Sequence, residues 1–363
     1  MNTYLITGGA GFIGSNFVRF LLEKYTDIHV LCLDKLTYAG NINNIKTELN
    51  NSNFTFIKGD INDPKILKDI FSKYKINCII NFAAESHVDR SIDSPQVFLK
   101  TNILGTQNLL KAAKEQWEIS ENEYGDGKKF IQISTDEVYG SCNTGKFKES
   151  SPLDPHSPYA ASKASADMMV KAYIDTYNFP ALITRCSNNY GPYQFPEKLI
   201  PLMINNMLNG LRLPVYGKGE NIRDWIHVLD HCKAVDLIAN KGKIGEIYNI
   251  QGNSEKKNID LVKLLIIKIR QLLEKEPQYK NLMNAPLEKI NDELIEFVKD
   301  RPGHDFRYAM DSTKIEKLGW SPKVSFDEGI KLTVLWYFEN MGWLKNVISG
   351  EYQKYYEKMY VDR

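Results

Sequence analysis

Tyr159 and Lys163 have the residue types and the spacing for redox chemistry on an alcohol. They lie in an alanine-rich stretch, YAASKASA, that favours a helix and follows Ser157 and Pro158. A spacing of four places both side chains on one helical face, where a lysine ammonium lowers the pKa of a tyrosine from its reference value of about 10. Such a tyrosine can take the proton of a sugar hydroxyl while hydride leaves the same carbon. The plainer interpretation is an ordinary helix with a buried tyrosine and a surface lysine.

A second Tyr-x-x-x-Lys match occurs at Tyr124 and Lys128. With 20 tyrosines in the chain, a chance match is expected. This one lies in EYGDGK, a loop sequence that cannot fix both side chains, so Tyr159 and Lys163 are the better catalytic candidates.

An acidic pair, Asp136 and Glu137, follows Thr135 at the end of an expected strand. Ligands of open α/β sheets bind beyond the carboxyl ends of the strands. Loss of water from a hexose needs a base at C5 and an acid for the C6 hydroxyl, and adjacent carboxyls can divide these roles if their pKa values differ. The alternative is a loop that Thr135 and Asp136 merely cap.

A glycine-rich turn, TGGAGFIG, lies between the first expected strand and the first expected helix. Gly8, Gly11 and Gly14 let the backbone approach a pyrophosphate, and the helix start supplies free N–H groups. Asp34 ends the next strand, where it can bind a ribose 2′-hydroxyl and repel a 2′-phosphate, although Lys35 weakens that exclusion. These features predict NAD as the cofactor; a purely structural turn is the alternative.

The elements that must position these residues alternate along the first half of the chain. Strands are expected at 3–7, 28–34, 54–58, 76–83, 129–134 and 180–186, and helices at 12–25, 63–74, 95–117 and 157–177. This pattern predicts an α/β fold, a Rossmann doubly wound parallel sheet. Residues 1–187 are the expected NAD-binding domain, rejoined by part of 225–250. Residues 188–363 are expected to form mainly a smaller C-terminal substrate-binding lobe.

Within that lobe, residues 188–225 are expected to be irregular except for a helix near 198–209. Further helices are expected near 258–275, 327–341 and 350–360.

Composition excludes several classes of protein. The net charge is +1 and no apolar run of transmembrane length occurs, so neither nucleic acid nor a membrane is an expected partner. The five cysteines contain no CxxC pair, which favours reduced thiols and a cytoplasmic protein. His227 and His231 are four apart, but Val228 stands where a zinc protease would carry glutamate, so no metal site is expected.

Taken together, the chain resembles the extended short-chain dehydrogenase/reductase family and, within it, the dTDP-glucose 4,6-dehydratases. Beside TGGAGFIG and YAASK, the matching motifs are DKLTYAGN (34–41), AAESHVDR (83–90), STDEVYG (134–140), SNNYGP (187–192), PEKLIP (196–201), IRDW (222–225) and DRPGHD (300–305). They cover residues 3 to about 310 in family order. Gln251 departs from the pattern, which has glycine there.

The resemblance implies Asp136 as general acid, Glu137 as general base, and Thr135 as a partner of the C4 hydroxyl beside Tyr159, with Lys163 completing the catalytic set. The cofactor-binding set that we expect is Gly8, Gly11, Phe12, Ile13, Gly14, Asp34, Lys35, Thr37, Asp60, Ile61, Phe82, Ala83, Ala84, Ser86, Thr101, Tyr159, Lys163 and Asn189. The implied substrate contacts are Ser86, Thr135, Asn188, Lys198, Leu199, Pro214, Tyr216, Arg223, Asn258, Arg301, His304 and Tyr308.

The implied reaction converts dTDP-glucose to its 4-keto-6-deoxy product and water, as in dTDP-rhamnose-type deoxysugar biosynthesis. A nucleotide-sugar 4-epimerase is the rival of the same fold, and a non-catalytic NAD-binding scaffold is the rival of another class. The Asp136–Glu137 pair argues against the first, and the intact catalytic set argues against the second.

The resemblance also implies a homodimer built on the helices near 95–117 and 157–177. The face of the second helix away from the site is expected to offer Ala161, Ala164, Met168 and Ala172 for close packing.

Overall fold

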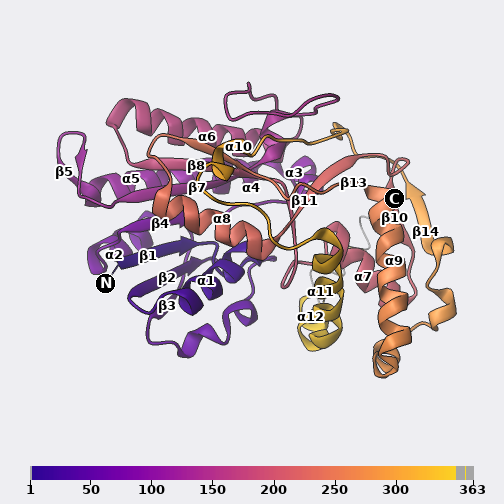
Figure 1. Ribbon diagram of the computed structural model, residues 1–363. Coiled ribbons are helices and arrows are strands. Elements are labelled where there is room, and N and C mark those ends of the chain that lie inside the picture. Colours follow the sequence, from indigo (N-terminus) through magenta and orange to yellow (C-terminus); the bar gives the residue numbers. More distant parts are fainter. Residues whose placement is uncertain (1, 349–355, 357–363) are drawn as a thin grey trace.

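Seven parallel strands form the central sheet of the protein, which a computed structural model describes for residues 2–348 and for Tyr356. The order across the sheet is β12-β8-β7-β4-β1-β2-β3. Figure 1 labels all of these strands except β12. These strands are β1 (Asn2–Thr7), β2 (Ile28–Asp34), β3 (Phe54–Lys58), β4 (Cys78–Asn81), β7 (Lys129–Thr135), β8 (Ala181–Cys186) and β12 (Ile247–Ile250). The chain runs outward from β1 through β2 to β3 and then returns to β4, so the order reverses between β1 and β4. The predicted doubly wound parallel sheet is confirmed.

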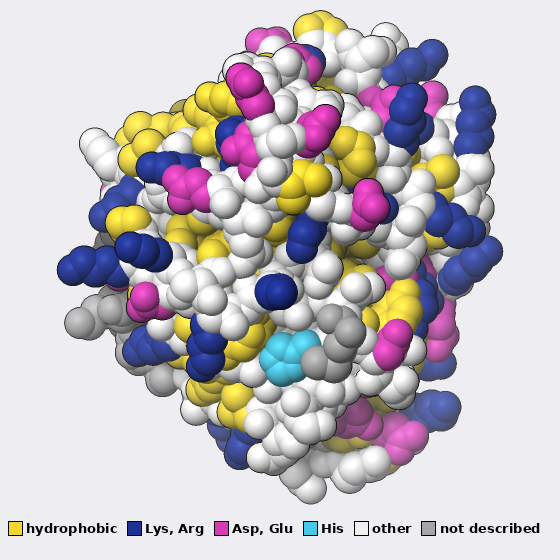
Figure 2. Space-filling model, turned by 90° about the vertical axis from the view of Figure 1, so that its left-hand side faces the viewer, with side chains coloured by type: hydrophobic (Ala, Val, Ile, Leu, Met, Phe, Trp, Pro, Cys, Tyr) yellow, Lys and Arg dark blue, Asp and Glu magenta, His cyan; other side chains and the backbone are white. Residues whose placement is uncertain are grey.

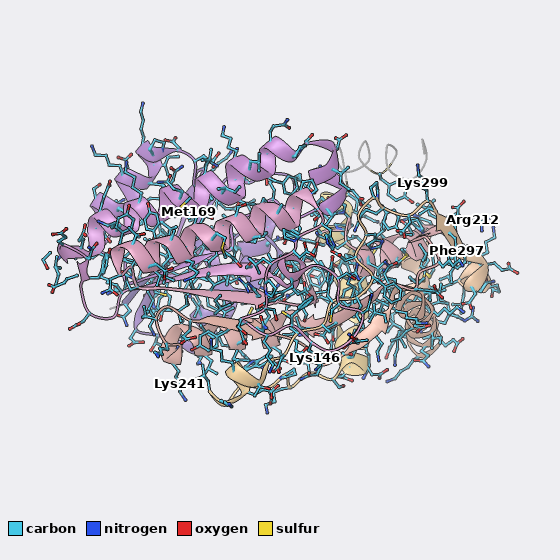
Figure 3. All side chains as sticks on the ribbon, turned by 90° about the horizontal axis from the view of Figure 1, so that it is seen from above. Lys146, Met169, Arg212, Lys241, Phe297 and Lys299 are labelled. Carbon is cyan, nitrogen blue, oxygen red and sulfur yellow. The ribbon has the colours of Figure 1, made fainter. Side chains whose placement is uncertain are left out.

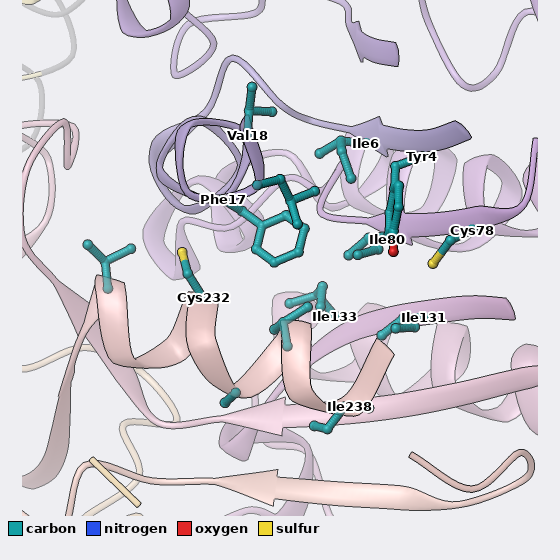
Figure 4. Close-up of a cluster of buried hydrophobic side chains, with 14 of the residues drawn as sticks. Tyr4, Ile6, Phe17, Val18, Cys78, Ile80, Ile131, Ile133, Cys232 and Ile238 are labelled. Carbon is teal, nitrogen blue, oxygen red and sulfur yellow. The ribbon is translucent and has the colours of Figure 1, made fainter. Parts of the chain in front are cut away.

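Helices cover both faces of this sheet. On one face, α1 (Phe12–Lys24) and α8 (Val228–Lys241) pack together. Figure 4 shows this layer, with side chains of α1 and α8 meeting those of the sheet strands. On the other face lie α2 (Pro64–Lys73), α5 (Thr106–Trp117) and α6 (Pro158–Tyr177). The two buried layers hold the strand ends rigidly in place, which is what a site at the sheet edge requires.

Local sequence explains where α6 begins and ends. The Ser157 hydroxyl accepts a hydrogen bond from the Ala160 N–H at 3.1 Å, and Pro158 occupies the first turn, where its missing N–H costs nothing. Asn178 closes the helix in the left-handed conformation. This start places Tyr159 and Lys163 in the first two turns, next to the carboxyl end of β7.

The expected helix at 95–117 contains a π-helical insertion. It consists of α4 (Pro95–Phe98), the π-helical η3 (Leu99–Gly105) and α5. Thr101 and Asn102 lie in η3, and Asn102 donates to the Ser162 hydroxyl of α6 at 2.8 Å. Figure 3 shows α6, marked by Met169, beside the α4–η3–α5 segment on the outside of the molecule.

The C-terminal part of the chain has its own apolar core, formed by α7 (Leu199–Asn209), α9 (Asn258–Lys275), α11 (Phe326–Glu339) and α12 (Met341–Val347) with the sheet pair β10 (Leu213–Tyr216) and β14 (Ile295–Val298). The prediction of irregular structure over 188–225 is wrong in part. β9 (Asn188–Tyr190) pairs in parallel with β11 (Ile222–His227), which also pairs with β13 (Glu255–Lys257). These short strands carry polar side chains that face the site, so they lack an apolar pattern.

The chain returns to the central sheet after β11, through α8 and then β12. The division into two domains at residue 187 stays a prediction. The helix expected near 350–360 lies outside the described residues, apart from Tyr356. The smaller elements are η1 (Ile42–Ile45), η2 (Glu48–Asn50), α3 (Val88–Asp93), β5 (Glu118–Ser120), β6 (Glu123–Tyr124), η4 (Asp136–Tyr139), η5 (Pro277–Leu282), η6 (Leu287–Lys289), η7 (Asp292–Leu294) and α10 (Thr313–Glu316).

The surface shown in Figure 2 mixes basic, acidic and apolar side chains, in keeping with the net charge of +1. Within residues 2–348 and 356, every helix is too short or too polar to cross a bilayer.

Candidate active site

Two adjoining cavities open at the carboxyl edge of the central sheet. The first measures about 290 Å³ and is lined by the glycine-rich turn, the ends of β2, β4 and β7, and the start of α6. The second measures about 160 Å³ and is lined by residues of α3, α7, β10, β11 and the loop at 301–308. Residues that line both are Ser86, Glu137, Asn188, Asn189, Gln194, Glu197 and Lys198. The two cavities therefore form one continuous site with a shared middle.

The glycine-rich turn wraps tightly against the end of β4. A Cβ on Gly8, whose φ is 66°, would lie 2.6 Å from the Ala83 nitrogen, and one on Gly14 would lie 2.2 Å from the Gly8 oxygen. Only glycine fits either position. The first turn of α1, which begins directly after Gly11, lines the first cavity with N–H groups that have no acceptor within the helix. This cradle fits a dinucleotide diphosphate.

Asp34 closes the far end of the first cavity. Its carboxylate accepts hydrogen bonds from the Ala10 N–H at 2.9 Å and the Leu36 N–H at 2.7 Å, which fixes its orientation. Burial raises the pKa of Asp34, while those two bonds oppose the shift. Lys35 forms an ion pair with Asp60 at 2.8 Å, so its ammonium is already engaged beside Asp34.

Tyr159 and Lys163 both line the first cavity from α6 and are almost fully buried. Burial raises the pKa of Tyr159 well above its usual range, the Glu137 carboxylate raises it further, and a hydrogen bond with Thr135 opposes this. The Lys163 ammonium donates to the Ile133 carbonyl at 2.5 Å, and burial lowers its pKa. The expected lowering of the Tyr159 pKa is wrong for this structure, because burial and the Glu137 carboxylate raise that pKa.

The acidic pair lies where β7 ends and η4 begins. Thr135 caps η4: its hydroxyl accepts from the Glu137 N–H at 3.3 Å and donates to the Asp136 carboxylate at 3.1 Å. Burial and then Glu137 raise the pKa of Asp136 well above its usual range. Burial also raises the pKa of Glu137, but the charges of Arg223, Lys198 and Arg301 oppose that shift. The pKa of Asp136 is thus raised further than that of Glu137, and a difference in this direction is what an acid beside a base requires.

The second cavity gathers cationic side chains. Arg223 is fixed by hydrogen bonds to the carbonyls of Ile222 and Asp305 and lies 4.1 Å from the Tyr308 ring centroid. Lys198 donates to the Ser86 carbonyl at 2.6 Å. Arg223, Lys198 and Arg301 thus line one small cavity, together with the acidic residues Asp89, Glu137 and Glu197. Their N–H donors can bind a ligand with two negative charges.

Asp89 is a residue of this cavity that the sequence reasoning missed. It accepts two hydrogen bonds from Arg301, both at 2.8 Å, and a third from the Tyr216 hydroxyl at 3.1 Å. Although burial acts to raise it, these bonds and the Arg301 charge lower the pKa of Asp89 to about 2. Its place in the AAESHVDR motif was the only signal available, since its partner lies 212 positions away.

Every residue of the expected cofactor set and of the expected catalytic set lines the first cavity. Every expected substrate contact lines the second cavity, except Thr135, which lines the first. Tyr124 and Lys128 lie elsewhere: the Tyr124 hydroxyl donates to the Tyr177 carbonyl and Lys128 to the Ile76 carbonyl. His231 is paired with Asn189 at 2.9 Å, and no group of three metal-ligating side chains occurs among the described residues.

The chain is similar over nearly its full length to proteins of known function. The sequence profile described as GDP-mannose 4,6 dehydratase matches residues 5–333. A dTDP-glucose 4,6-dehydratase of Xanthomonas campestris pv. campestris (strain B100) is 46% identical over 355 residues, covering 97% of this chain and 98% of that protein. The dTDP-glucose 4,6-dehydratase 1 of Escherichia coli (strain K12) is 45% identical and covers 99% of both chains.

Solved structures are similar as well. The dTDP-glucose 4,6-dehydratase of Streptomyces venezuelae, crystallised with NAD bound, aligns with a TM-score of 0.83 at 45% identity and covers 95% of this chain and 99% of that one. The UDP-glucose 4-epimerase of Thermotoga maritima aligns at 30% identity with a TM-score of 0.77, covering 93% and 99%.

Proposed function

The chain belongs to the dTDP-glucose 4,6-dehydratase family, and from this premise we propose that it is an NAD-dependent hydro-lyase that converts dTDP-glucose to dTDP-4-keto-6-deoxy-glucose and water. One observation carries the proposal: the Tyr159–Lys163 pair and the Asp136–Glu137 pair line the same cavity as the glycine-rich turn. A simple dehydrogenase or an epimerase needs the first pair and has no use for the second.

The cofactor is held by the first cavity in this proposal. The first turn of α1 receives the diphosphate, and Asp34 binds the adenosine ribose. The chemistry that NAD would supply in this cavity is reversible hydride transfer, from C4 of the hexose and back to C6. Asp34 also favours NAD over NADP, because Lys35 is paired with Asp60 and is not free to neutralise a 2′-phosphate.

The chain's own groups move the protons. Tyr159 takes the proton of the C4 hydroxyl, with Thr135 as the second hydrogen-bond partner at that oxygen. Glu137 then removes the proton at C5, and Asp136 gives a proton to the departing C6 hydroxyl. The proton held by Glu137 returns to C5 when C6 receives the hydride. Lys163 supplies positive charge on the same face of α6 as Tyr159.

The diphosphate and nucleoside of the substrate lie in the second cavity. Arg223 and Arg301 are the planar donors for diphosphate oxygens, and Lys198 adds a third cation, close enough to interact electrostatically with Glu137 and Arg301. The hexose then extends through the shared middle of the site toward Tyr159. One substrate molecule would therefore occupy part of both cavities.

The protein is further proposed to act as a homodimer in the cytoplasm. Exposed apolar side chains on the α4–η3–α5 segment and on α6 support the dimer: Val97, Leu99, Leu104 and Met168. Ala161 and Ala172 are exposed on the same face of α6, but Ala164 is buried against Val138 and Met310 and cannot take part as expected. Five buried, unpaired cysteines fit a reducing compartment.

Incubation of the purified protein with dTDP-glucose tests the proposal. A product that has lost one water and gains the alkaline absorbance of a 4-keto-6-deoxy sugar is expected, without net NADH. Tyr159→Phe should abolish the product, whereas Tyr124→Phe, the other Tyr-x-x-x-Lys tyrosine, should not. Stoichiometric release of NADH would indicate a simple dehydrogenase, and interconversion of UDP-glucose and UDP-galactose without loss of water would indicate an epimerase.

A further inference from the structure

An aromatic cluster joins Trp336 and Tyr337 of α11 and Trp343 of α12 to Tyr193, which lies in the loop between β9 and α7. The Tyr193 ring lies 4.6 Å from the Trp336 ring and 5.8 Å from the Trp343 ring, centroid to centroid. The Tyr337 hydroxyl donates to the Gln194 carbonyl at 2.6 Å. The cluster therefore fixes the segment around Tyr193, which borders both cavities, against α11 and α12.

Trp343 also reaches beyond the cluster to the Rossmann part of the chain. Its indole N–H donates to the side-chain oxygen of Asn44 at 2.7 Å. Asn44 lies in η1, is only 1% exposed, and receives a further hydrogen bond on its backbone carbonyl from Arg19 at 2.9 Å. A buried amide of this kind keeps one orientation only if both of its ends are bonded.

The other end of the Asn44 amide holds the glycine-rich turn. Its side-chain nitrogen donates to the Ala10 carbonyl at 2.9 Å, and the Ala10 N–H in turn donates to Asp34 at 2.9 Å. Ala10 lies between Gly9 and Gly11 in the glycine-rich turn. A chain of hydrogen bonds thus runs from Trp343 of α12 through Asn44 to Ala10 and on to the Asp34 carboxylate. In the proposed function, Asp34 binds the adenosine ribose.

We propose that Trp343 and Asn44 are positioning residues for the dinucleotide, so that the C-terminal helix α12 helps to build a cofactor site formed by the other end of the chain. The inference rests on the proposed NAD-binding function. Without the indole N–H, the buried Asn44 oxygen has lost a partner and the amide can rotate. The Ala10 carbonyl then loses one of its two donors and keeps only the Asn41 N–H at 3.0 Å. The turn would then have to be ordered by the cofactor itself, which weakens binding.

The test separates this hydrogen bond from aromatic packing. Trp343→Phe keeps a ring in the cluster and removes the donor, while Trp336→Phe makes the same change at a tryptophan that contacts Tyr193 without bonding Asn44. Asn44→Asp keeps the size of the side chain and removes the donor to Ala10. For each variant, NAD is titrated into the apo-protein and its affinity is measured by calorimetry. Thermal unfolding is followed with and without NAD.

Trp343→Phe is expected to weaken NAD binding about tenfold, or about 1.4 kcal/mol, and Asn44→Asp by more. Trp336→Phe should leave NAD affinity unchanged, and the KM for dTDP-glucose at saturating NAD should be unaffected in both tryptophan variants. Unchanged NAD affinity in folded Trp343→Phe and Asn44→Asp would overturn the inference, as would equal weakening by the two tryptophan variants. If the wild-type protein itself failed to bind NAD, the proposed function would fall instead.

Discussion

At the scale of single residues, the Asp89–Arg301 pair stands out because Asp89 is buried and the Arg301 side chain is only 17% exposed, in the cavity proposed to admit a diphosphate. Removing one partner of a buried pair leaves the other charge uncompensated, which typically costs about 3–5 kcal/mol. We therefore expect Asp89→Asn to lower the free energy of unfolding of the free protein by an amount in this range. A bound nucleoside diphosphate should recover much of it, since the diphosphate restores negative charge next to Arg301.

Thermal unfolding with and without dTDP measures this effect. The ligand-induced rise in Tm should be larger for Asp89→Asn than for wild type. Asp300→Asn is the control, because Asp300 pairs with His304 at the more exposed rim of the same loop. Equal ligand-induced shifts in wild type and Asp89→Asn would contradict the prediction.

The acid–base pair predicts a bell-shaped pH profile for kcat/KM. On the acid side, activity is lost as Glu137 becomes protonated. This loss occurs at a pH above 4.5, the ordinary pKa of a glutamate, because burial raises the pKa of Glu137. On the alkaline side activity is lost as pH rises through the raised pKa of Asp136, when the acid has no proton to give.

Asp136→Asn should therefore reduce product formation by about 10²–10⁴-fold while C4 oxidation persists, so absorbance of reduced cofactor builds up. Asp154→Asn is a suitable control, since the Asp154 side chain is 81% exposed. A variant Asp136→Asn with an unchanged alkaline limb would assign the acid role to another group.

Sequence reasoning could find the residues of the site but not the interactions that set their pKa values. Tyr159 and Lys163 were found by their spacing, yet the direction of the Tyr159 shift depends on Glu137 and on burial. Both effects arise only once β7 and α6 have packed together. Asp89 could not be predicted for the same reason. Its role depends on its contact with Arg301, which lies 212 positions further along the chain.

At the scale of elements, α6 carries the redox pair, and its start depends on Ser157. Because the Ser157 hydroxyl caps the Ala160 N–H, Ser157→Ala should lower the free energy of unfolding by about 1 kcal/mol. Ser165→Ala is the matched control on the same helix: Ser165 is exposed and bonds only within the helix, so alanine there should be neutral or slightly stabilising. Urea unfolding measures both, and equal effects would rule out the capping role.

The strands of the central sheet were predictable because they are apolar on both faces, as at LIT in β1 and IIN in β4. β9 and β11 were not. Their sequences are NNY and IRDWIH, and their residues Asn188 and Arg223 line the second cavity. Because polar residues of the site occupy these strands, the apolar pattern that identifies a strand is missing. The π-helical turn at 99–105 likewise has no sequence signature of its own and became visible only in three dimensions.

At the scale of the whole molecule, the exposed apolar side chains of α6 and η3 predict how the protein assembles. Met168 is 46% exposed and Leu104 is 55% exposed. If these side chains meet their copies across a two-fold axis, a charge at either position is desolvated on dimerisation. Met168→Asp and Leu104→Asp should then shift the protein from dimer toward monomer.

Sedimentation velocity at micromolar concentration is the measurement. Wild type should sediment at about twice the chain mass of 41.7 kDa. Ile267→Asp provides the control, because Ile267 is 50% exposed on α9, away from the proposed interface. A fully active wild-type species of 41.7 kDa would show that the dimer is not needed.

The order of strands in the sheet has a consequence for synthesis of the chain on the ribosome. β8 ends at Cys186, but its outer neighbour β12 begins only at Ile247, after the chain has passed through α7, β10, β11 and α8. Until then the outer edge of β8 presents unpaired backbone groups, which is the kind of surface that recruits other strands and promotes aggregation. α8, which covers one sheet face with α1, arrives equally late. The central sheet therefore cannot be completed before α7, β10 and β11 have emerged, so it matures together with this later part of the chain.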